Sequence, residues 1–418
     1  MAAIIAAVIV VYRDAAGGYF FQDDFQWLAG TLTYRPSQVF DIAGRTHFYR
    51  PMIEMYFWTF TAAFDGSPRL FHIANVLLHA INGLLLFLLA GALTRNDRFA
   101  FTTALCFVVL PGYVEAVTWI SALAEPVAAF WGCVMLYAFV RSRTRGGAAW
   151  RALSVIAFVL TLVTHESSVV FLLLLLLAEW TFFGRSRPLR RAIVDVVRLA
   201  APYGVAIVFY LAIDFSINAK SYVVEEGYYR LGLHAVPNVL GYIVWLYVGK
   251  RNMLSYAMIT VALLALVLLG TRRVRFAVCW MLLALMPFAF FTWGNTSRYL
   301  YLPAMGFAML VAEGIEWVDG RLSSRVNRLL RHAVIALLIA AVTVRFAAFA
   351  SRGVSNFSER TEAYRRFTQD LRQDYPQLGP YSSVPIDPAI ATRLTYRYLE
   401  GLVRWEYRDP TLRVVVQE

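Results

Sequence analysis

The feature that most constrains this chain is a series of apolar runs about as long as a membrane is thick. A spanning helix needs about 20 mostly apolar residues, and segments such as 70–93, 192–213 and 333–350 approach that length. Because backbone in lipid must satisfy its own hydrogen bonds, these runs are predicted to be α-helices. Only 16% of the residues are charged, against about a quarter in soluble domains. A surface that faces water throughout is therefore excluded.

Positive charge is placed in a pattern that predicts the topology. The formal net charge is +12, but no nucleic-acid partner is expected, because the arginines lie in short connections between apolar runs. Cytoplasmic loops of membrane proteins are enriched in Lys and Arg. The arginine-rich connections are therefore predicted to be cytoplasmic: 95–98, 141–151, 184–191, 271–275 and 319–332. The alternate connections hold a single arginine and are predicted to lie outside: 111–122, 164–168 and 293–298.

This pattern predicts an all-α polytopic membrane protein with about 11 transmembrane helices. Residues 1–350 are expected to form the transmembrane domain, with long extracytoplasmic loops at 13–69 and 214–252. Residues 351–418 are expected to form a small extracytoplasmic tail with a helix near 357–374 and a strand at 412–416. The predicted spans are 1–12, 70–94, 99–111, 119–140, 152–164, 168–183, 192–213, 253–270, 276–292, 299–316 and 333–350. A cleaved signal peptide is the alternative for 1–12, although no basic stretch precedes it.

Residues 152–183 are too few for two full crossings of a membrane. The turn at 164–167 is therefore predicted to lie below the outer surface. Non-helical backbone at that depth is tolerated only beside protein or a water-filled cavity. A cavity that opens to the outer face is expected here.

Two adjacent acids, Asp23 and Asp24, follow the first apolar run and lie between aromatic residues. Carboxylates in such a place are costly unless they are paired, hydrogen-bonded or bound to a metal. The alternative is a structural one, because Asp is favoured in the first turn of a helix. The pair is a candidate for chemistry on the outer side.

Two arginines on the predicted outer side, Arg50 and Arg298, are candidates for binding an anion. Arg50 follows His47, Phe48 and Tyr49, and it either binds lipid headgroups or clamps a substrate phosphate through bidentate hydrogen bonds. Arg298 opens the sequence Arg-Tyr-Leu-Tyr-Leu-Pro, which contains Tyr299 and Tyr301. Arg298 is expected to have an anionic partner, which is either a structural acid or a lipid phosphate.

Other polar residues lie in or beside the predicted spans, towards the same side. One set shares a face of the span 70–94 because its members are three or four residues apart, and interhelical hydrogen bonding and cavity lining are open alternatives. These residues are His72, Asn75, His79 and Asn82. A second set consists of Glu115, Glu125, His165 and Glu166. Acids at such depth are functional candidates.

Taken in sequence order, these motifs resemble the GT-C class of membrane glycosyltransferases. They run from Asp23-Asp24 through Arg50, His72, Glu115 and His165-Glu166 to Arg298. The pattern is most similar to the O-mannosyltransferases that carry tetratricopeptide repeats and to their bacterial relatives. The resemblance covers roughly 20–350. The chain departs from the family in having His165 where Lys is common, in lacking a His-x-x-His element before Glu115, and in lacking repeats after the last span.

The resemblance implies transfer of a sugar from a polyprenyl-phosphate donor to a hydroxyl of an acceptor protein or glycan, at the outer face of a bacterial cytoplasmic membrane. It implies that Asp23 or Asp24 acts as general base or holds a metal ion. Our hypothesis is that Asp24 is the base with support from Asp23, and that Arg298, Arg50 and a protonated His165 stabilise the donor phosphate. Glu115, Glu166 and Glu125 are expected to orient the acceptor or a divalent cation such as Mg or Mn. The expected cavity lining is His72, Asn75, His79, Tyr49, Tyr299 and Tyr301. A single displacement by the acceptor inverts the anomeric centre.

Three other classes of protein compete with this interpretation. A transporter or flippase of lipid-linked saccharides also needs a polar cavity, but such proteins often show internal repeats, and the polar residues here gather on one side. An O-antigen polymerase or ligase would depend more on outer-loop residues such as Arg230 and His234. A structural membrane protein whose tail binds a partner is opposed only by the clustered acids. In every case membrane lipids are expected partners.

Overall fold

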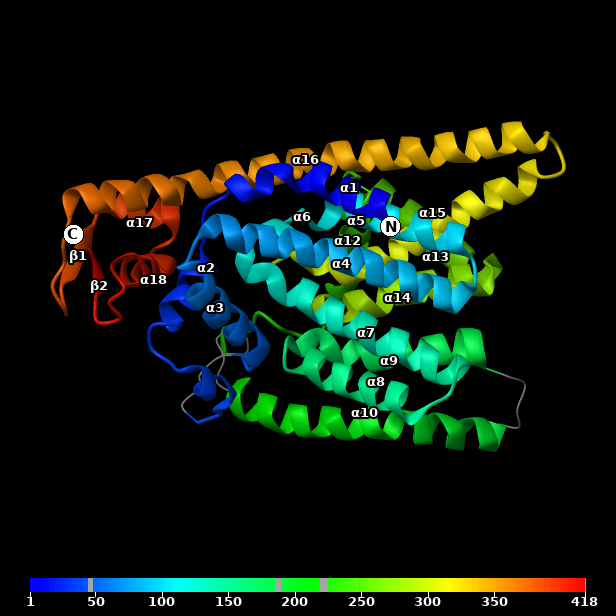
Figure 1. Ribbon diagram of the computed structural model, residues 1–418, viewed down its shortest axis with the longest axis horizontal. Helices are drawn as coiled ribbons and strands as arrows, with labels where there is room; N and C mark the ends of the chain where they lie inside the picture. Colours follow the sequence, from blue (N-terminus) through cyan, green and yellow to red (C-terminus); the bar gives the residue numbers. More distant parts are fainter. Residues whose placement is uncertain (44–47, 185–188, 219–224, 248, 418) are drawn as a thin grey trace.

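The computed structural model describes residues 1–43, 48–184, 189–218, 225–247 and 249–417. His47 and part of the arginine-rich connection 184–191 lie outside the described residues. The described chain is predominantly helical, and Figure 1 shows its longest helices packed side by side along the long axis of the molecule. The prediction of an all-α fold is confirmed, apart from one short pair of strands.

The centre of the bundle is α4 (Pro68–Thr94), which packs against α1 (Ala2–Tyr12), α5 (Asp97–Val109) and α7 (Ala124–Thr144). The other bundle helices are α8 (Ala148–Leu162), α9 (Val170–Ala178), α10 (Leu189–Asn218), α12 (Ala235–Leu246), α13 (Met253–Leu269), α14 (Arg272–Leu285), α15 (Tyr301–Leu322) and α16 (Arg328–Asp374). Packing is tight where α7 meets α9. A Cβ atom at Gly132 would lie 1.9 Å from the ring of Phe171, so only glycine fits there.

Five helical segments of the described chain are long and apolar enough to cross a membrane, or six if one bent pair counts as a single span. The five are Pro68–Thr94, Ile120–Thr144, Glu166–Phe183, Ile193–Ile217 and Arg328–Asp374. Helices α8, α12 and α13 are apolar but shorter, and α12 lies within the region 214–252 that was expected to be a loop. The chain is an integral membrane protein, but the predicted number of spans is not confirmed.

The bent pair joins α5 to the short segment Pro111–Thr118 at an angle of 45°. Leu110 has extended backbone angles, as the residue before a proline prefers, so α5 ends there. The chain then forms η3 (Pro111–Tyr113), α6 (Val114–Thr118) and η4 (Ile120–Leu123). This irregular stretch carries Glu115 and Ser121 to the end of the bundle.

The turn between α8 and α9 lies inside the protein. It contains η5 (Glu166–Val169), and Thr164 and His165 are 0% and 6% exposed. Helix α9 continues into a π-helix, η6 (Glu179–Phe183). Enclosure by protein is one of the two conditions that permit irregular backbone at membrane depth.

Two short helices lie between α1 and α4, within the first long loop. They are α2 (Asp23–Gly30) and α3 (Pro51–Phe64). Between them, η2 (Pro36–Phe40) packs against α3. Figure 1 shows α2 and α3 at one end of the bundle.

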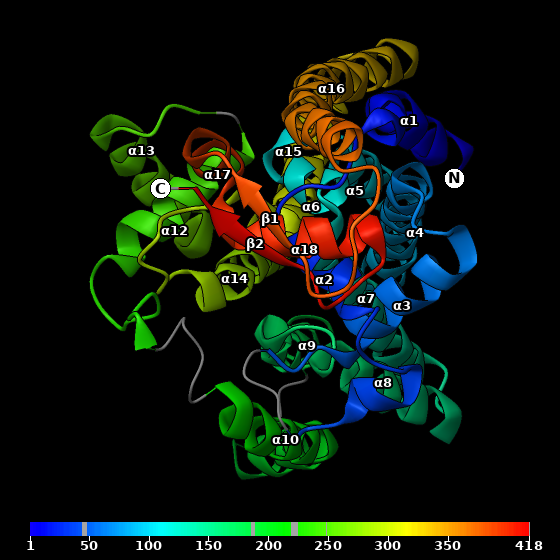
Figure 2. The ribbon, with the colours of Figure 1, turned by 90° about the vertical axis from the view of Figure 1, so that its left-hand side faces the viewer.

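The C-terminal module, residues 375–417, follows α16 at this same end. Helix α16 is continuous for 47 residues and crosses the boundary predicted at residue 350. Strands β1 (Ser383–Ile386) and β2 (Arg413–Val416) pair in parallel, and α17 (Pro388–Leu394) and α18 (Tyr396–Tyr407) lie between them in the sequence. Figure 2 shows α18 beside α2.

The module shares one hydrophobic core with the first loop. Phe20 and Phe25 lie with Leu399, Leu402 and Trp405 in a single cluster of buried side chains, and the rings of Phe20 and Trp405 meet edge to face at 6.4 Å. Because burial of apolar area contributes about 25 cal/mol per Å², this common core fixes the module against α2.

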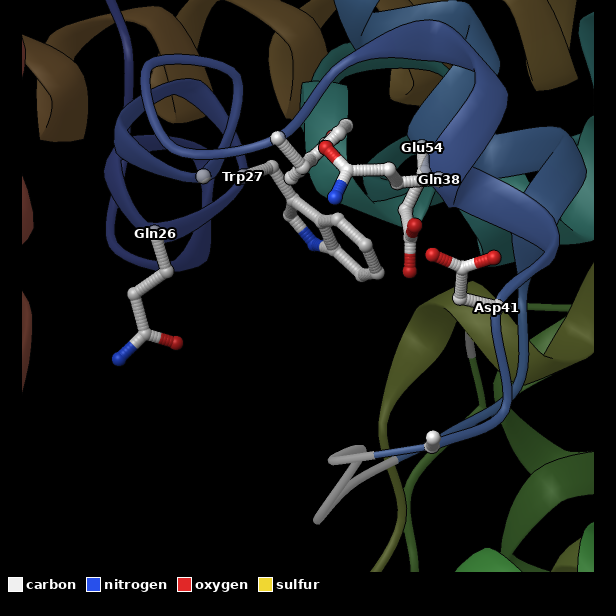
Figure 3. A pocket seen from close by; sticks show the side chains of 8 residues that line it. Gln26, Trp27, Gln38, Asp41 and Glu54 are labelled. Carbon is white, nitrogen blue, oxygen red and sulfur yellow. The ribbon is translucent and has the colours of Figure 1, made fainter.

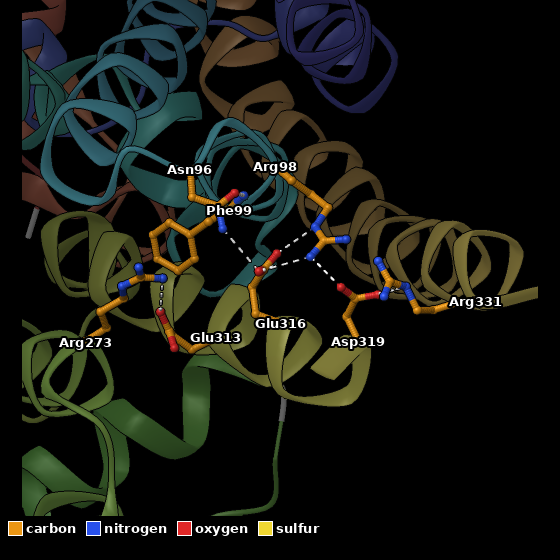
Figure 4. A network of polar contacts seen from close by, with 8 residues as sticks. All are labelled: Asn96, Arg98, Phe99, Arg273, Glu313, Glu316, Asp319 and Arg331. Atoms are coloured by element: carbon orange, nitrogen blue, oxygen red, sulfur yellow. Dashed lines mark hydrogen bonds and ion pairs between the residues drawn. The ribbon is translucent and has the colours of Figure 1, made fainter. Parts of the chain in front are cut away.

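The opposite end of the bundle is held by charge pairs (Figure 4). Arg98, at the start of α5, contacts Glu316 at 2.7 Å and Asp319 at 2.6 Å, and both acids lie on α15. Asp319 also contacts Arg331 of α16 at 3.1 Å. Three helices are therefore joined through one network of side chains.

Candidate active site

The two adjacent acids at the start of α2 point to different surroundings. Asp24 is fully buried. Its carboxylate accepts hydrogen bonds from the backbone N–H of Phe21 at 2.8 Å and of Ser121 at 2.7 Å, and from the hydroxyl of Ser121. Burial raises the pKa of Asp24 to about 7, although these three donors oppose the shift. Asp24 therefore ties α2 to η4.

Asp23 faces the positively charged part of the site. Arg298, Arg397 and Arg50, together with the hydroxyl of Tyr398 on α18, act on its carboxylate electrostatically. Burial raises the pKa of Asp23 above its ordinary value, while these four groups, led by Arg298, lower it. Asp23, and not Asp24, is the carboxylate placed beside the arginines.

The backbone just before this pair is strained. Gln22 has a φ of 46°, in a region that non-glycine residues seldom occupy. Such conformations persist where the surrounding structure imposes them, and they gather at functional sites. Here the strain accompanies the turn that directs Asp24 towards η4.

Arg298 lies in η8 (Ser297–Leu300), at the start of α15. Its guanidinium contacts Glu115 at 3.3 Å and lies over the rings of Trp119 and Tyr299, at 4.9 Å from each centroid. Ser297 donates a hydrogen bond of 2.7 Å to the other oxygen of Glu115. The anionic partner expected for Arg298 is therefore present in the protein itself.

Arg50 lies immediately before α3 and forms a two-point contact with Glu166. Its Nε donates to one carboxylate oxygen at 2.9 Å and its Nη2 to the other. The guanidinium also lies 4.3 Å from the centroid of Phe48. This pair joins the first loop to the buried turn between α8 and α9.

His165 lies between two of the predicted acids. Its Nδ1 accepts a hydrogen bond from the backbone N–H of Ser167 at 3.2 Å, and its Nε2 lies 3.5 Å from Glu125. A ring nitrogen that accepts a hydrogen bond carries no proton, so this geometry describes a neutral imidazole. The sequence suggests that a protonated His165 helps to bind the phosphate. This arrangement favours the neutral form instead.

Asp23, Arg298, Glu115, Arg50 and Glu166 form a charged cluster. Most of the remaining predicted site residues lie away from it. His79 and Tyr301 bond to each other at 2.8 Å, and Asn82 donates to the same tyrosine at 3.0 Å. His72 lies near the carbonyl of Tyr19 at 3.4 Å. These buried contacts correspond to the structural alternative of interhelical hydrogen bonding, so His72, His79 and Tyr301 are parts of the core and do not face the cluster.

Asn75 and Tyr49 also bond locally, and Tyr299 does not. Asn75 accepts a hydrogen bond from Tyr56 at 2.9 Å, and the hydroxyl of Tyr49 donates to the carbonyl of Phe40 at 3.4 Å. Tyr299 differs from them because it stacks against Phe288 at 4.1 Å and contacts Arg298. Of the six residues expected to line the cavity, Tyr299 is the one in direct contact with the charged cluster.

A cavity of about 380 Å³ lies beside α2 and α3. Its lining includes Gln26, Trp27, Gln38, Asp41 and Glu54. Figure 3 shows the indole of Trp27, the amide of Gln38 and the carboxylates of Glu54 and Asp41 directed towards the same space. Trp27 is held by stacking on Phe57 at 5.8 Å. An indole face beside amides and carboxylates suits a hydroxyl-rich ligand.

The arrangement of acids does not favour a metal site. Among the described residues, no group of three or more His, Cys, Asp or Glu side chains is placed to hold a metal ion. Glu115 and Glu166 are instead engaged by arginines. An Mg or Mn ion stays a prediction, and no chemical step is assigned to one.

Sequence reasoning missed several participants in this site. Ser121 and Trp119 lie in a predicted outer turn, but nothing in their local sequence marks them as partners of Asp24 and Arg298. Arg397 and Tyr398 lie in the tail, far along the chain from Asp23. The amphipathic pattern of 396–407 was a signal that this segment packs as a helix, although it does not say against what.

Solved structures show where this fold occurs. No protein-family model matches the chain, and no curated protein matches it. ArnT from Cupriavidus metallidurans bound to undecaprenyl phosphate is similar over 100% of this chain and 85% of its own, with 15% identity and a TM-score of 0.57. The Archaeoglobus fulgidus oligosaccharyltransferase is similar over 99% of this chain and 62% of its own, with 13% identity and a TM-score of 0.55.

A further structure of the Archaeoglobus enzyme, AglB in complex with an inhibitory peptide and a dolichol-phosphate, is similar at 10% identity with a TM-score of 0.54. It covers 98% of this chain, which spans 63% of the length of AglB. These likenesses show that the chain shares the fold of these structures. The narrower resemblance to O-mannosyltransferases stays a prediction.

Proposed function

We propose that this protein is a membrane glycosyltransferase that transfers a sugar from a polyprenyl-phosphate donor to an acceptor hydroxyl. The observation that carries the proposal is the convergence of Asp23, Arg298 and Arg50, which come from the start of α2, the start of α15 and the start of α3. Two of the similar structures hold a polyprenyl phosphate, which supports a donor of this class.

The arginines supply the positive charge that the departing phosphate requires. As the sugar departs, negative charge builds on the phosphate, and donors already fixed in place stabilise it. A guanidinium has five N–H donors, and the contacts of Arg298 with Glu115 and Tyr299 engage two of them. Glu115 and Glu166 hold the guanidinium groups in position, so little reorganisation is needed when the donor binds.

Asp23 is the group we assign as general base, in place of the Asp24 expected from the sequence. Asp23 accepts the proton of the acceptor hydroxyl while the acceptor oxygen attacks the anomeric carbon. The bond from that carbon to the phosphate oxygen breaks, and the polyprenyl phosphate leaves with the bonding electrons. A single displacement inverts the anomeric centre, and a base of this kind contributes about 10²–10⁴-fold.

The cavity beside α2 is the place we propose for the acceptor. Trp27 and Gln26 follow Asp23 by one helical turn, so an acceptor bound against them approaches the base from its own helix. Carboxylates from Asp41 and Glu54 accept hydrogen bonds from hydroxyl groups but oppose a phosphate. The donor phosphate is therefore expected on the arginine side and the acceptor on the cavity side.

A bacterial cytoplasmic membrane with the site on its outer face is part of this proposal. It rests on the arginine-rich connections, of which the one at 319–332 joins α15 to α16 at the end of the bundle away from α2 (Figure 1). Loops enriched in arginine remain on the cytoplasmic side. Mannose remains the sugar that the resemblance suggests.

The proposal is tested with purified protein in liposomes that contain radiolabelled polyprenyl-phosphate hexoses and membrane extracts as a source of acceptor. Label that moves into an acid-stable product supports transfer. Translocation of the intact labelled lipid across the bilayer, without any loss of its sugar, would indicate a flippase instead.

A further inference from the structure

Glu125 is a buried acid near the site that the proposed transfer does not use. It lies in the first turn of α7 and is 5% exposed. Its Oε1 has no hydrogen-bond partner among the residues that the structure describes. A carboxyl oxygen that leaves water without gaining a partner is costly, so native proteins keep few of them. This oxygen is therefore a candidate to accept a hydrogen bond from a bound ligand.

The first turn of α7 is fixed by a side chain of α4. Asn82 donates hydrogen bonds to the carbonyl of Pro126, the residue after Glu125, at 2.9 Å and to the hydroxyl of Tyr301 at 3.0 Å. Groups that are fixed before a ligand binds lose little freedom on binding. The bundle thus sets the position from which Glu125 meets a ligand.

His165 places a donor beside this oxygen. Its Nδ1 accepts a hydrogen bond from the backbone N–H of Ser167 at 3.2 Å, so the proton of the neutral imidazole is on Nε2. Nε2 lies 3.5 Å from Oε1 of Glu125, whereas an N–H···O hydrogen bond is about 2.7–3.2 Å long. Glu125 and His165 form a Glu–His pair whose donor and acceptor are neighbours but do not bond to each other.

The Glu–His pair is connected to both arginines of the charged cluster. By one path, Nδ1 of the imidazole is 3.9 Å from Glu166, which holds Arg50. By another, the imidazole lies 6.3 Å from the ring of Phe288, which stacks on Tyr299 at 4.1 Å. Tyr299 in turn contacts Arg298. Each guanidinium is therefore linked to the pair through one or two intervening side chains.

Two other roles fit the pair less well. A phosphate would be opposed by a carboxylate at Glu125, because like charges repel. A structural pair in the core would be expected to bond closely, as His79 and Tyr301 do at 2.8 Å. The Glu–His pair instead leaves a buried oxygen without a donor, in the part of the bundle that holds the arginines.

We propose that Glu125 and His165 recognise a hydroxyl group of the donor sugar. The inference rests on the proposed function in placing the donor phosphate at Arg298 and Arg50. A hydroxyl group both donates and accepts, so one hydroxyl accepts from Nε2 of His165 and donates to Oε1 of Glu125. The sugar is bonded to the phosphate and therefore lies next to the arginines. Neither residue of the pair takes part in bond making or breaking, and the pair determines which sugar is held.

The test compares the binding of two kinds of lipid to purified protein. One is undecaprenyl phosphate, and the other is undecaprenyl phosphate that carries mannose, glucose or galactose. Sugar preference is the affinity for the best of the three hexose lipids divided by the affinity for undecaprenyl phosphate, and in wild type it should exceed one. Glu125→Met removes both carboxyl oxygens, so sugar preference should fall about tenfold with unchanged affinity for undecaprenyl phosphate. Glu125→Gln keeps one acceptor oxygen and should lose less.

Glu313→Met is the matched control, because it removes a carboxylate at the opposite end of the bundle. Glu313 contacts Arg273 there at 3.5 Å (Figure 4), and its loss should leave sugar preference unchanged. Melting temperatures separate recognition from a structural role. Residues that serve binding are often replaced without loss of stability, so Glu125→Met should melt at or above the wild-type temperature.

An unchanged sugar preference in Glu125→Met overturns the inference, as does a wild type that binds none of the hexose lipids more tightly than undecaprenyl phosphate. A melting temperature of Glu125→Met well below that of wild type would show a structural contact and would also contradict it. If sugar preference depends on Glu125 but wild type transfers no sugar, the recognition stands and the proposed function fails. If wild type transfers sugar and its preference does not depend on Glu125, the inference alone fails.

Discussion

Asp24 and Ser121 are joined by two hydrogen bonds, one from the backbone N–H of Ser121 at 2.7 Å and one from its hydroxyl. This contact fixes Asp24 to η4 and leaves the adjacent Asp23 on the side of Arg298. Two neighbouring carboxylates thus have separate tasks: one holds the loop, and the other faces the cations.

Asparagine variants of the two acids should separate these tasks. Asp23→Asn removes the proposed base, so the transfer rate should fall by about 10²–10⁴-fold with little change in melting temperature. Asp24→Asn disrupts a buried set of hydrogen bonds, which should cost about 1–3 kcal/mol of stability. Transfer assays and thermal unfolding of both variants check this. Equal activity of Asp23→Asn and wild type would refute the assignment of the base.

Stability should depend on pH through Asp24. Its pKa rises from an ordinary value of 3.8 to about 7 in the folded protein, so the folded state retains a proton that the unfolded chain releases between these values. Stability from this group is therefore present at low pH and is lost as pH rises through about 7. The difference in melting temperature between wild type and Asp24→Asn should change across this window. A difference that stays constant from pH 4 to pH 8 would contradict the shift.

Binding of the lipid phosphate should depend on Arg298 as a guanidinium. Lysine keeps the charge but not the planar set of donors, so Arg298→Lys should weaken binding of undecaprenyl phosphate by roughly tenfold, equivalent to about 1.4 kcal/mol. Arg13→Lys is the control, because the side chain of Arg13 is 75% exposed. Lipid binding to the purified variants measures both. Binding by Arg298→Lys equal to that of wild type would show that charge alone, and not the planar set of donors, governs binding.

Trp27 should matter for the acceptor and not for the donor. Trp27→Ala removes the indole face of the cavity, so the KM for acceptor should rise about tenfold or more, in line with the 1–3 kcal/mol that such an aromatic contact contributes elsewhere. Undecaprenyl phosphate should bind as it does to wild type. Trp180→Ala serves as control, because Trp180 is 77% exposed on η6. A loss of donor binding in Trp27→Ala would place the donor in the cavity and invert the proposed arrangement.

The charge network at the far end should contribute to stability only. Arg98 joins Glu316 and Asp319 but is itself 37% exposed, so solvent screening reduces its contribution to about 1 kcal/mol. Arg98→Ala should lower the melting temperature without altering the pH–rate profile. Arg143→Ala, which removes an isolated pair with Glu179 at 2.8 Å, should have a smaller effect. If Arg98→Ala lowers the melting temperature less than Arg143→Ala does, the network gives no more stability than separate ion pairs would.

The sequence was informative where physical chemistry acts locally. Long apolar runs predict helices, because backbone in lipid must satisfy its own hydrogen bonds. The shortage of residues between 152 and 183 predicts a buried turn, because the segment is too short to cross the membrane twice. An anionic partner was likewise expected for Arg298, whereas Arg50 was expected to bind lipid headgroups or a substrate phosphate. Their partners, Glu115 and Glu166, come from other parts of the chain and were not assigned to them.

The roles of Asp23 and Asp24 could not be told apart from the sequence. Both begin the same helix, and their difference arises from Ser121, which lies in a distant segment and bonds to Asp24 alone. The polar face of α4 shows the same limit. Its periodicity predicts a shared face, but only packing against Tyr301 reveals that His79 bonds inside the bundle. Helix α12 was missed because 12 residues are fewer than a span requires.

The most direct test of this account is transfer of label from radiolabelled undecaprenyl-phosphate hexoses by wild-type and Asp23→Asn protein in the same liposomes. The account predicts transfer by wild type, a loss of about 10²-fold or more in Asp23→Asn, and unchanged binding of undecaprenyl phosphate by the variant. Transfer by Asp23→Asn at the wild-type rate would contradict the central claim.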